Sequence, residues 1–451
     1  MECKKIIFQI SKPLNPIDLW NYEATKKNSL LRRCEIILHV LGNFFKKKNK
    51  SDLKFICIYL FQFFKQLGLN IISIAYLPAA IILYFLNYRF IHISYWQIGT
   101  LSFQVDILVK KYLLDNLGDK NETVNLKKII FLCPANYCSN KGLLNLYKKK
   151  ITVIDGVLKT LFFLPFLQLP KITWNPFFIE HNIKNSESYK IYSKYDNIIG
   201  KNIFAYSLVE KNYFISKLKN LKINLDSKKI ICLHLRDESF YKEKSFNSSR
   251  NANFQDYEST IKYLIKNNYC VVRFVNKISD FKEENYYELD TSLIENQEIQ
   301  IFLISIAYFF IGCSSGPLYV ANLFKTPTLC TNFFPYSQLI GYNKFDLTVP
   351  KKIYSTKVKR YLTLKEIFSN EIYLLASSRI LDRHFLETHN NDSDVLINAA
   401  KEMINNLEKN IIVQTVNQKK VYSFLPKESG CYYGQGNLSS YFIEKNIDLI
   451  T

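Results

Sequence analysis

The side chains best suited to chemistry in this chain are arginine, histidine and serine residues between positions 230 and 316. Only nine of the sixty basic residues are arginine, yet Arg236, Arg250 and Arg273 all fall within one strand–helix–strand segment. A guanidinium group offers a rigid fork of donors that grips phosphate oxygens at two points, which lysine cannot do. The pattern therefore predicts a phosphorylated ligand at the carboxyl ends of parallel strands.

The first strand of this segment contains His234 and leads directly into Arg236 and Asp237. Because His234 stands in an apolar run, it is either a core histidine with satisfied ring nitrogens or a catalytic or orienting group. Asp237, Glu238 and Asp256 are the nearby carboxylates, and the sequence does not choose a base among them. We take His234, Arg236 and Asp237 as the candidate catalytic residues.

Two further arginines accompany this strand. Arg250 and Asn251 follow the flexible run Asn247-Ser248-Ser249. Arg250 is either a surface arginine or an anion-binding group, and its loop is expected above the strand ends. Arg273 lies inside the next strand, where alternation of the two faces points it away from its apolar neighbours. It is either paired with a buried carboxylate or part of the functional site.

A serine-rich turn is the second chemical feature. Ser314, Ser315 and Gly316 separate an apolar strand from a helix that begins near Pro317. Free amides at a helix N-terminus, two hydroxyls and a glycine allow the close approach of an anion. The alternative is that Ser315 serves only as the N-cap of the helix. In a doubly wound sheet, this turn and the His234–Arg236 loop open on the same edge, where ligands bind.

Strands that alternate with helices predict a doubly wound α/β fold with a parallel sheet. In the second half, strands are expected at 230–235, 269–275, 286–289, 308–311 and 328–331. The expected regions are a helical, basic and membrane-associating segment (1–87), two Rossmann-like domains (88–215 and 216–365) and a C-terminal helical tail (366–451).

Composition narrows the classes of function. A net charge of +21 would suit a nucleic-acid-binding protein, but the lysines are spread along the whole chain. We therefore expect either that the basic surface is simply solvated or that it contacts an anionic membrane. The ten cysteines form no C-x-x-C pair, which predicts buried free thiols and no zinc site. No Asp-x-Asp stands beside the loops described above, so we expect neither a bound metal nor a cofactor.

The segment 67–86 has no charged residue, and its twenty residues would span a bilayer as one helix. Pro78, Asn70 and Ser73 argue against a single span. We favour an interfacial or re-entrant membrane-associating element over a true span or a buried core helix. Further along, Gly99 and Thr100 follow a short strand. Gly99 either forms part of a simple turn or lets this loop approach a ligand in a cleft between the domains.

A set of short motifs runs along the chain: His234-Leu235-Arg236-Asp237, Arg250-Asn251-Ala252, Tyr257, Val272-Arg273, Phe309-Phe310-Ile311-Gly312, Ser314-Ser315-Gly316, Asn332, Ile98-Gly99-Thr100-Leu101, and Ser439-Ser440-Tyr441-Phe442-Ile443 with Asn446. Together these motifs resemble a group of bacterial glycosyltransferases found among surface-polysaccharide loci. More remotely, the chain resembles the GT-B fucosyltransferase-like superfamily, whose His-x-Arg and Ser-Ser loops hold a nucleotide-sugar diphosphate. Thr100 stands where the bacterial group has histidine in its Ile-Gly-His-Leu motif.

The resemblance implies a GT-B architecture of two facing Rossmann-like domains, with acceptor bound by the first and nucleotide-sugar donor by the second. It implies metal-independent transfer of a hexosyl or deoxyhexosyl group to a surface glycan or lipid-linked acceptor. The donor-binding candidates are then Arg236, Arg250, Asn251, Ser314, Ser315 and Gly316, and Gly99 and Thr100 lie on the acceptor side. We expect a cytoplasmic protein, peripheral or monotopic at the inner face of the membrane, without nucleic acid. The alternatives are a non-catalytic nucleotide- or polyanion-binding protein and a sugar-nucleotide epimerase of the same fold.

Overall fold

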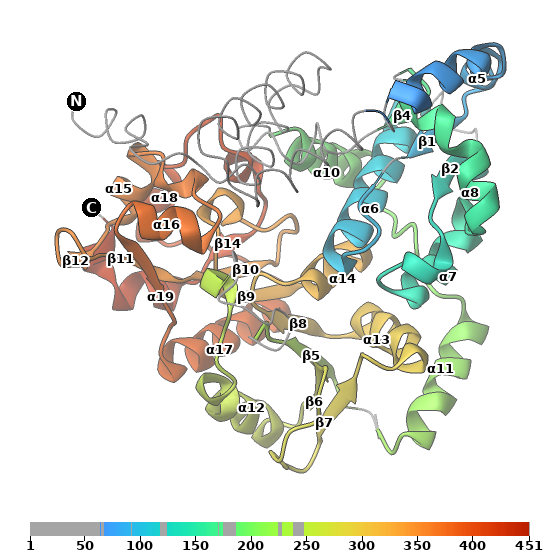
Figure 1. Cartoon of the computed structure of the whole chain (residues 1–451). Helices are drawn as coiled ribbons and strands as arrows, with labels where there is room; N and C mark the ends of the chain where they lie inside the picture. The colour runs from blue at the N-terminus through green and yellow to red at the C-terminus, as the bar shows by residue number, and fades with distance from the viewer. Residues whose placement is uncertain are drawn as a thin grey trace, which may run out of the picture. The chain divides into compact units, whose positions relative to one another are not determined.

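The computed structural model describes residue 64 and residues 67–91, 93–117, 124–169, 171–174, 186–223, 228–237 and 248–450. The described chain is mixed α/β, with two parallel sheets and one small antiparallel sheet (Figure 1). Residues 1–63, where basic amphipathic helices are expected, lie outside the described residues, as does Glu238.

Two compact units are built from interleaved segments of the chain. Unit 1 comprises Met1–Ile93, Asn125–Pro134 and Ile151–Asn182, and unit 2 comprises the remainder. Consecutive domains with limits at 87/88, 215/216 and 365/366 stay a prediction, and so does the GT-B arrangement of two facing domains.

Unit 1 contains a four-stranded parallel sheet in the order β3-β2-β1-β4. Its strands are short apolar runs, which is typical of strands covered on both faces. The ring of Phe90 in β1 stacks on Phe166 with centroids 4.7 Å apart, and this pair lies in the core of the unit. The elements are α5 (Leu77–Phe85), β1 (Arg89–Ile91), β2 (Ile129–Leu132), β3 (Thr152–Ile154), α8 (Val157–Phe163), the 3-10 helix η3 (Leu164–Gln168) and β4 (Thr173–Trp174).

Unit 2 contains a seven-stranded sheet in the order β14-β10-β9-β8-β5-β6-β7, and every neighbouring pair is parallel. All strands expected between residues 230 and 331 are present, with ends that differ by one or two residues. The strands are β5 (Ile230–His234), β6 (Cys270–Val275), β7 (Tyr286–Asp290), β8 (Phe309–Gly312), β9 (Thr328–Phe333), β10 (Leu347–Pro350) and β14 (Asn437–Leu438). Cys232, Cys270, Cys313 and Cys330 are buried free thiols, as expected.

Helices of unit 2 come from both halves of the chain. In particular, α6 packs along α14, which follows β8 (Figure 1). The helices are α6 (Ile98–Asp115), α7 (Lys141–Lys150), α10 (Glu187–Ile198), α11 (Leu208–Asn220), α12 (Gln255–Lys266), α13 (Ile294–Ile306), α14 (Gly316–Phe324), α15 (Leu364–Ser369), α16 (Ser378–Arg383), α17 (Ser393–Lys409), α18 (Val416–Tyr422) and α19 (Ser440–Lys445).

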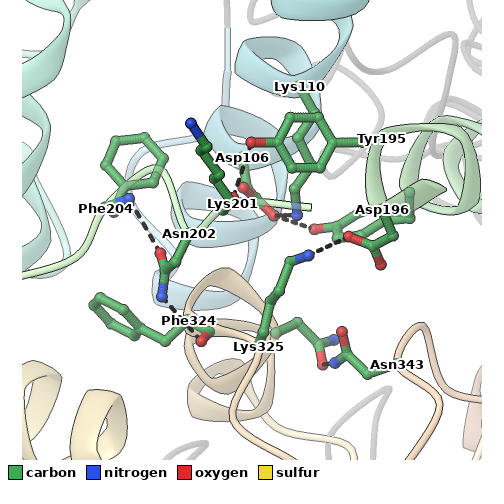
Figure 2. A network of polar contacts seen from close by, with 12 residues as sticks. Asp106, Lys110, Tyr195, Asp196, Lys201, Asn202, Phe204, Phe324, Lys325 and Asn343 are labelled. Carbon is green, nitrogen blue, oxygen red and sulfur yellow. Dashed lines mark hydrogen bonds and ion pairs between the residues drawn. The ribbon is translucent and has the colours of Figure 1, made fainter. Parts of the chain in front are cut away.

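A polar network holds α6 within unit 2 (Figure 2). The Lys110 ammonium donates to Asp106 Oδ2 at 2.6 Å, and the hydroxyl of Tyr192 in α10 donates to the same oxygen at 2.5 Å. Lys325, at the end of α14, forms an ion pair with Asp196 of α10. Asp106 and Lys110 are buried, so the loss of one partner would leave the other charge uncompensated in the protein interior.

The C-terminal region is less purely helical than expected. Strands β11 (Lys352–Ser355), β12 (Arg360–Tyr361) and β13 (Leu386–His389) form the antiparallel sheet. Within the expected helical tail, β13 belongs to that sheet and β14 extends the seven-stranded sheet, while α19 packs against α17 and α18. The short lengths of these strands explain why their sequence pattern is weak.

The apolar segment 67–86 folds as two helices, Leu67–Ala75 and Leu77–Phe85, with axes bent by 67° at the break. Among the residues described, no single helix has the length and apolarity for a membrane span, and this bent pair passes that test only when its two helices are combined. Pro78 at the start of α5 explains the break, because proline cannot continue the hydrogen-bond pattern of a preceding helix.

Candidate active site

The site is built at the carboxyl ends of β5 and β8, the neighbouring strands from which the sheet grows in opposite directions. From β5 the chain moves through β6 to β7, and from β8 through β9 and β10 towards the other edge. His234 at the end of β5 stands in register with Gly312 at the end of β8. In doubly wound sheets, ligands bind outside the carboxyl ends of the strands at such a topological switch point.

His234 and Ser315 meet at the carboxyl ends of these two strands. The His234 Nδ1 and Ser315 Oγ atoms are 2.9 Å apart, a hydrogen bond whose direction depends on the histidine tautomer. Burial lowers the pKa of His234 to about 4, aided by Arg273 and Arg236 and opposed by Asp237. The imidazole is therefore neutral at pH 7 and supplies hydrogen bonding to the site rather than charge.

Arg236 joins the switch-point turn to the loop that carries Arg250. Its backbone N–H donates to the Cys313 sulfur at 3.0 Å, and its carbonyl accepts from the Ala252 N–H at 2.9 Å. The Arg236 side chain is half-buried, and Asp237 next to it is exposed. The structure therefore places the base of the Arg236 side chain at the carboxyl edge, as the sequence predicts.

The loop of Arg250 and Asn251 is anchored from several sides. The Asn251 carbonyl accepts from the ammonium of Lys351 at 2.6 Å, and the Ser249 N–H donates to the hydroxyl of Ser378 at 2.8 Å. Lys351 follows β10, is buried, and has its pKa lowered to about 8 by that burial. The sequence did not lead us to select Lys351 as a residue near the site. The available signal was a lysine directly after the apolar run that forms β10.

Ser314 has a different surrounding from Ser315. Its hydroxyl donates to the Phe334 carbonyl and accepts from the Phe334 N–H at 3.1 Å. The Ser314 hydroxyl thus joins the end of β8 to the residue after β9 and is already used in both directions. The turn also fits the spacing Gly-x-Ser-x-Gly of serine hydrolases, centred on Ser314, but a hydroxyl held in this way is not presented as a nucleophile.

Gly316 fulfils a packing requirement at the start of α14. A Cβ atom at Gly316 would lie 2.3 Å from Ile98 Cγ2 and 2.9 Å from the backbone nitrogen of Gly99. The missing side chain therefore makes room for the start of α6, and a donor-binding role for Gly316 stays a prediction. Thr100 donates its hydroxyl to the Ser94 carbonyl at 2.6 Å and fixes the turn that precedes α6.

The convergence of α6 and α14 has an electrostatic consequence. The first N–H groups of each helix have no partner inside the helix, and the helix dipole adds partial positive charge at that end. Because Gly99 and Gly316 belong to the first turns of these helices and lie against each other, two positive helix ends meet next to Ser315. Ser315 stands at the N-cap position of α14, but its hydroxyl bonds His234 and makes no cap bond.

The other motif residues brace the strands around the site. Arg273 pairs with Glu288 of β7 at 2.9 Å, the buried carboxylate that strand alternation predicts. Asn332 donates to the Tyr257 hydroxyl at 3.0 Å and accepts from the Asn391 N–H at 2.6 Å. The Asn332 contacts are buried and the Arg273 contact is partly buried, and both tie the strands to their neighbours.

All binding and catalytic roles expected from the sequence stay predictions: those of His234, Arg236, Asp237, Arg250, Asn251, Ser314, Ser315 and Gly316, and the acceptor-side role of Gly99 and Thr100. Among the side chains that the structure describes, no three His, Cys, Asp or Glu residues lie close enough together to hold a metal ion. The expectation of a metal-independent reaction likewise stays a prediction.

Comparisons with known proteins give only distant similarities. No family model matches the chain, and no curated protein matches it. ADP-heptose LPS heptosyltransferase II of E. coli is similar over 54% of this chain and 84% of its own, with 13% identity and a TM-score of 0.33. A glycosyl transferase family 9 structure from Veillonella parvula DSM 2008 is similar over 71% and 97%, with 9% identity and a TM-score of 0.37.

A third similar structure is the iron-containing dodecameric glycosyltransferase TibC from enterotoxigenic E. coli H10407. It matches over 55% of this chain and 58% of its own, with 10% identity and a TM-score of 0.30. Similarities at these TM-scores identify neither a fold family nor an activity for this chain.

Proposed function

We propose that this protein is a glycosyltransferase of the GT-B type that binds a nucleotide-sugar donor at the carboxyl edge of the seven-stranded sheet. The observation that carries the proposal is the meeting of His234 and Ser315 at the topological switch point, between β5 and the N-terminus of α14. A crevice at this point of a doubly wound sheet, lined by a helix N-terminus, suits a diphosphate.

The charges around the crevice fit the reaction. Transfer of a sugar leaves a nucleoside diphosphate whose negative charge grows in the transition state. Arg236 and the N-terminus of α14, with the Gly316 N–H and the helix dipole, would neutralise that charge, and they act most strongly where it develops. The neutral His234 would orient Ser315 and the diphosphate, while the exposed Asp237 is the candidate base for the acceptor hydroxyl.

The donor would be a nucleoside diphosphate sugar, and the acceptor a surface glycan or a lipid-linked sugar. The transferred group would be a hexosyl or deoxyhexosyl unit. The charge of Arg236 and of the helix end would take the part that a divalent cation takes in metal-dependent transfer.

A thermal-unfolding screen with UDP, GDP and ADP tests the donor site. A ligand that binds only the folded state raises the Tm with its concentration. We expect one diphosphate to raise the Tm, its monophosphate to do so less, and EDTA to leave the shift unchanged. The absence of a shift with any nucleoside diphosphate at millimolar concentration would contradict the proposal. A shift that disappears in EDTA would contradict the metal-independent part.

Product analysis separates the catalytic alternatives. A glycosyltransferase hydrolyses its matching donor slowly when no acceptor is present and releases the free sugar. An epimerase would convert the donor into an isomeric nucleotide sugar, and a non-catalytic binder would leave it intact. We expect slow hydrolysis without an isomer.

A further inference from the structure

Unit 1 carries a bare apolar face, which we define as the exposed side of the helix pair Leu67–Ala75 and α5 together with α8. Large aliphatic and aromatic side chains stand out from all three helices. Phe85 is 80% exposed, Leu158 is 83% exposed, and Ile82 and Phe162 are more than half exposed. Contiguous exposed patches of this kind mark interaction sites, whereas single exposed apolar residues do not.

The three helices form one continuous surface. Tyr76, at the break of the helix pair, packs edge-on against Phe166 at 5.1 Å and against Phe162 of α8 at 6.0 Å. On the inner side, Ala80 and Phe166 belong to the core that covers the four-stranded parallel sheet. The inner side of this layer is therefore buried within unit 1, and the outer side remains apolar and uncovered within unit 1.

Several polar groups at the break are hydrogen-bonded within the segment. The Tyr76 N–H donates to the Ser73 carbonyl at 3.0 Å, and the Ala80 N–H donates to the Tyr76 carbonyl at 2.9 Å. Pro78 has no N–H to satisfy, and the Ser73 hydroxyl donates to the Asn70 carbonyl at 2.6 Å. Groups left unpaired at a bend would be costly in lipid, and here these groups are paired inside the segment.

The edge of the face has the residues of a membrane interface. The Arg89 guanidinium lies 4.7 Å from the ring centroid of Tyr84 and 5.9 Å from that of Trp174. Tyrosine, tryptophan and arginine collect at the level of lipid headgroups. The described part of unit 1 holds five basic side chains (Arg89, Lys127, Lys128, Lys159 and Lys171) and a single acidic one, Asp155.

We propose that unit 1 docks on an anionic lipid surface through this apolar face, with α5 and α8 both immersed at the interface. A protein partner fits less well, because interfaces between separable proteins are about as polar as the rest of a protein surface. The basic edge selects for anionic headgroups. The docking does not depend on the sugar chemistry, but if both proposals hold, the acceptor is a lipid-linked molecule in the same membrane.

Sedimentation of the full chain with vesicles tests the docking. The vesicles contain phosphatidylcholine either alone or mixed with phosphatidylglycerol. The test variant is Phe85→Glu/Leu158→Glu, and the matched control is Val209→Glu/Val416→Glu, in which valines that are 79% and 82% exposed lie in unit 2. All four positions are exposed, so their replacement costs little folding free energy.

We expect the wild type and the control to bind the anionic vesicles more strongly than the neutral ones. The test variant should lose at least about tenfold in partition coefficient, because it places charge in the apolar layer. Equal binding by test variant and wild type, or a wild type that stays in the supernatant, would overturn the proposal. If the wild type is a dimer that does not bind vesicles, and the test variant is a monomer while the control stays dimeric, a second copy of the chain covers the face instead of lipid.

Nucleotide titration of the same proteins separates the two proposals. The test variant should keep the diphosphate-induced Tm shift of the wild type, because Phe85 and Leu158 belong to unit 1 and the switch point to unit 2. If the wild type binds vesicles but no nucleoside diphosphate raises its Tm, the glycosyltransferase proposal is wrong and the docking proposal stands. If a nucleoside diphosphate raises the Tm but the wild type does not bind vesicles, the docking proposal is wrong and the glycosyltransferase proposal stands.

Discussion

Gly99 and Gly316 lie against each other where α6 and α14 begin, and neither position has space for a side chain. A Cβ atom at Gly99 would come within 3.0 Å of Gly316 Cα, and one at Gly316 within 2.9 Å of the Gly99 nitrogen. Contacts this short involve backbone atoms that cannot rotate away. The two glycines therefore let two helix N-termini converge beside the proposed diphosphate site.

Replacement of Gly316 by alanine is expected to destabilise unit 2. The added methyl group would clash with Ile98 and with the backbone of Gly99, and overpacking of this kind costs about 1–3 kcal/mol. Urea unfolding should therefore show a lower midpoint for Gly316→Ala, and Gly316→Val should lower it further. Nucleotide affinity should fall as well, because the helix ends would move apart.

Gly68→Ala is the matched control. Gly68 lies in the helix Leu67–Ala75, and no atom lies within 4 Å of the position that an added Cβ would take, so alanine there should leave stability unchanged or raise it slightly. If Gly316→Ala unfolds at the same urea concentration as wild type, the close packing of α6 and α14 is wrong.

Arg236→Lys is expected to weaken nucleoside diphosphate binding by about 10- to 100-fold, or about 1.4–2.7 kcal/mol. The substitution keeps the positive charge but loses the fork that grips two phosphate oxygens. Calorimetric titration of the diphosphate identified by the thermal screen measures the change. The backbone contacts of Arg236 with Cys313 and Ala252 should persist, so the Tm without ligand should change little.

Arg360→Lys provides the control for this experiment. Arg360 forms an exposed ion pair with Glu366 and lies on the small antiparallel sheet, so its replacement should leave nucleotide affinity unchanged. Equal affinities for wild type and Arg236→Lys would remove Arg236 from the site.

His234 should make the folded state sensitive to acid between pH 6.5 and pH 4. Burial lowers the pKa of His234 to about 4 in the folded state, whereas an unfolded histidine titrates near its ordinary value of 6.5. As the pH falls, the unfolded chain takes up the proton first, so protonation favours unfolding. The contribution is fully present above pH 6.5 and is lost progressively towards pH 4.

The measurement compares urea midpoints of wild type and His234→Gln across this range. Glutamine retains hydrogen-bonding capacity towards Ser315 but does not titrate, so its profile should be flatter than that of wild type. Parallel profiles would show that His234 is not buried in its neutral form.

The sequence predicted five of the seven strands in the seven-stranded sheet, β5 to β9, because these are mostly apolar runs ended by polar or turn residues. It did not predict β10 or β14. It also predicted that the loops after β5 and β8 share one edge, since this follows from parallel strands alone. It could not place α6, because Asp106 and Lys110 have the spacing of an exposed helical ion pair, and only tertiary packing buries them. Likewise, the roles of Ser314 and Ser315 depend on Phe334 and His234, which are distant in the sequence.

The final prediction separates the two neighbouring serines. Ser314→Ala removes both hydrogen bonds to the Phe334 backbone and leaves that buried N–H and carbonyl without their partner. The free energy of unfolding should fall by about 1–3 kcal/mol. Nucleotide affinity should change little in the molecules that remain folded, because the Ser314 hydroxyl is already engaged by the Phe334 backbone.

Ser315→Ala should show the opposite profile. Its hydroxyl makes no cap bond for α14, so its loss should cost little stability, whereas the loss of its bond to His234 should weaken diphosphate binding by about 1–2 kcal/mol. Unfolding and titration of both variants decide between the roles, and Ser337→Ala, at a buried serine of a neighbouring turn, controls for generic effects. If Ser314→Ala weakens binding while Ser315→Ala does not, the ligand contacts the β9 side of the turn, and the diphosphate must be moved from the N-terminus of α14.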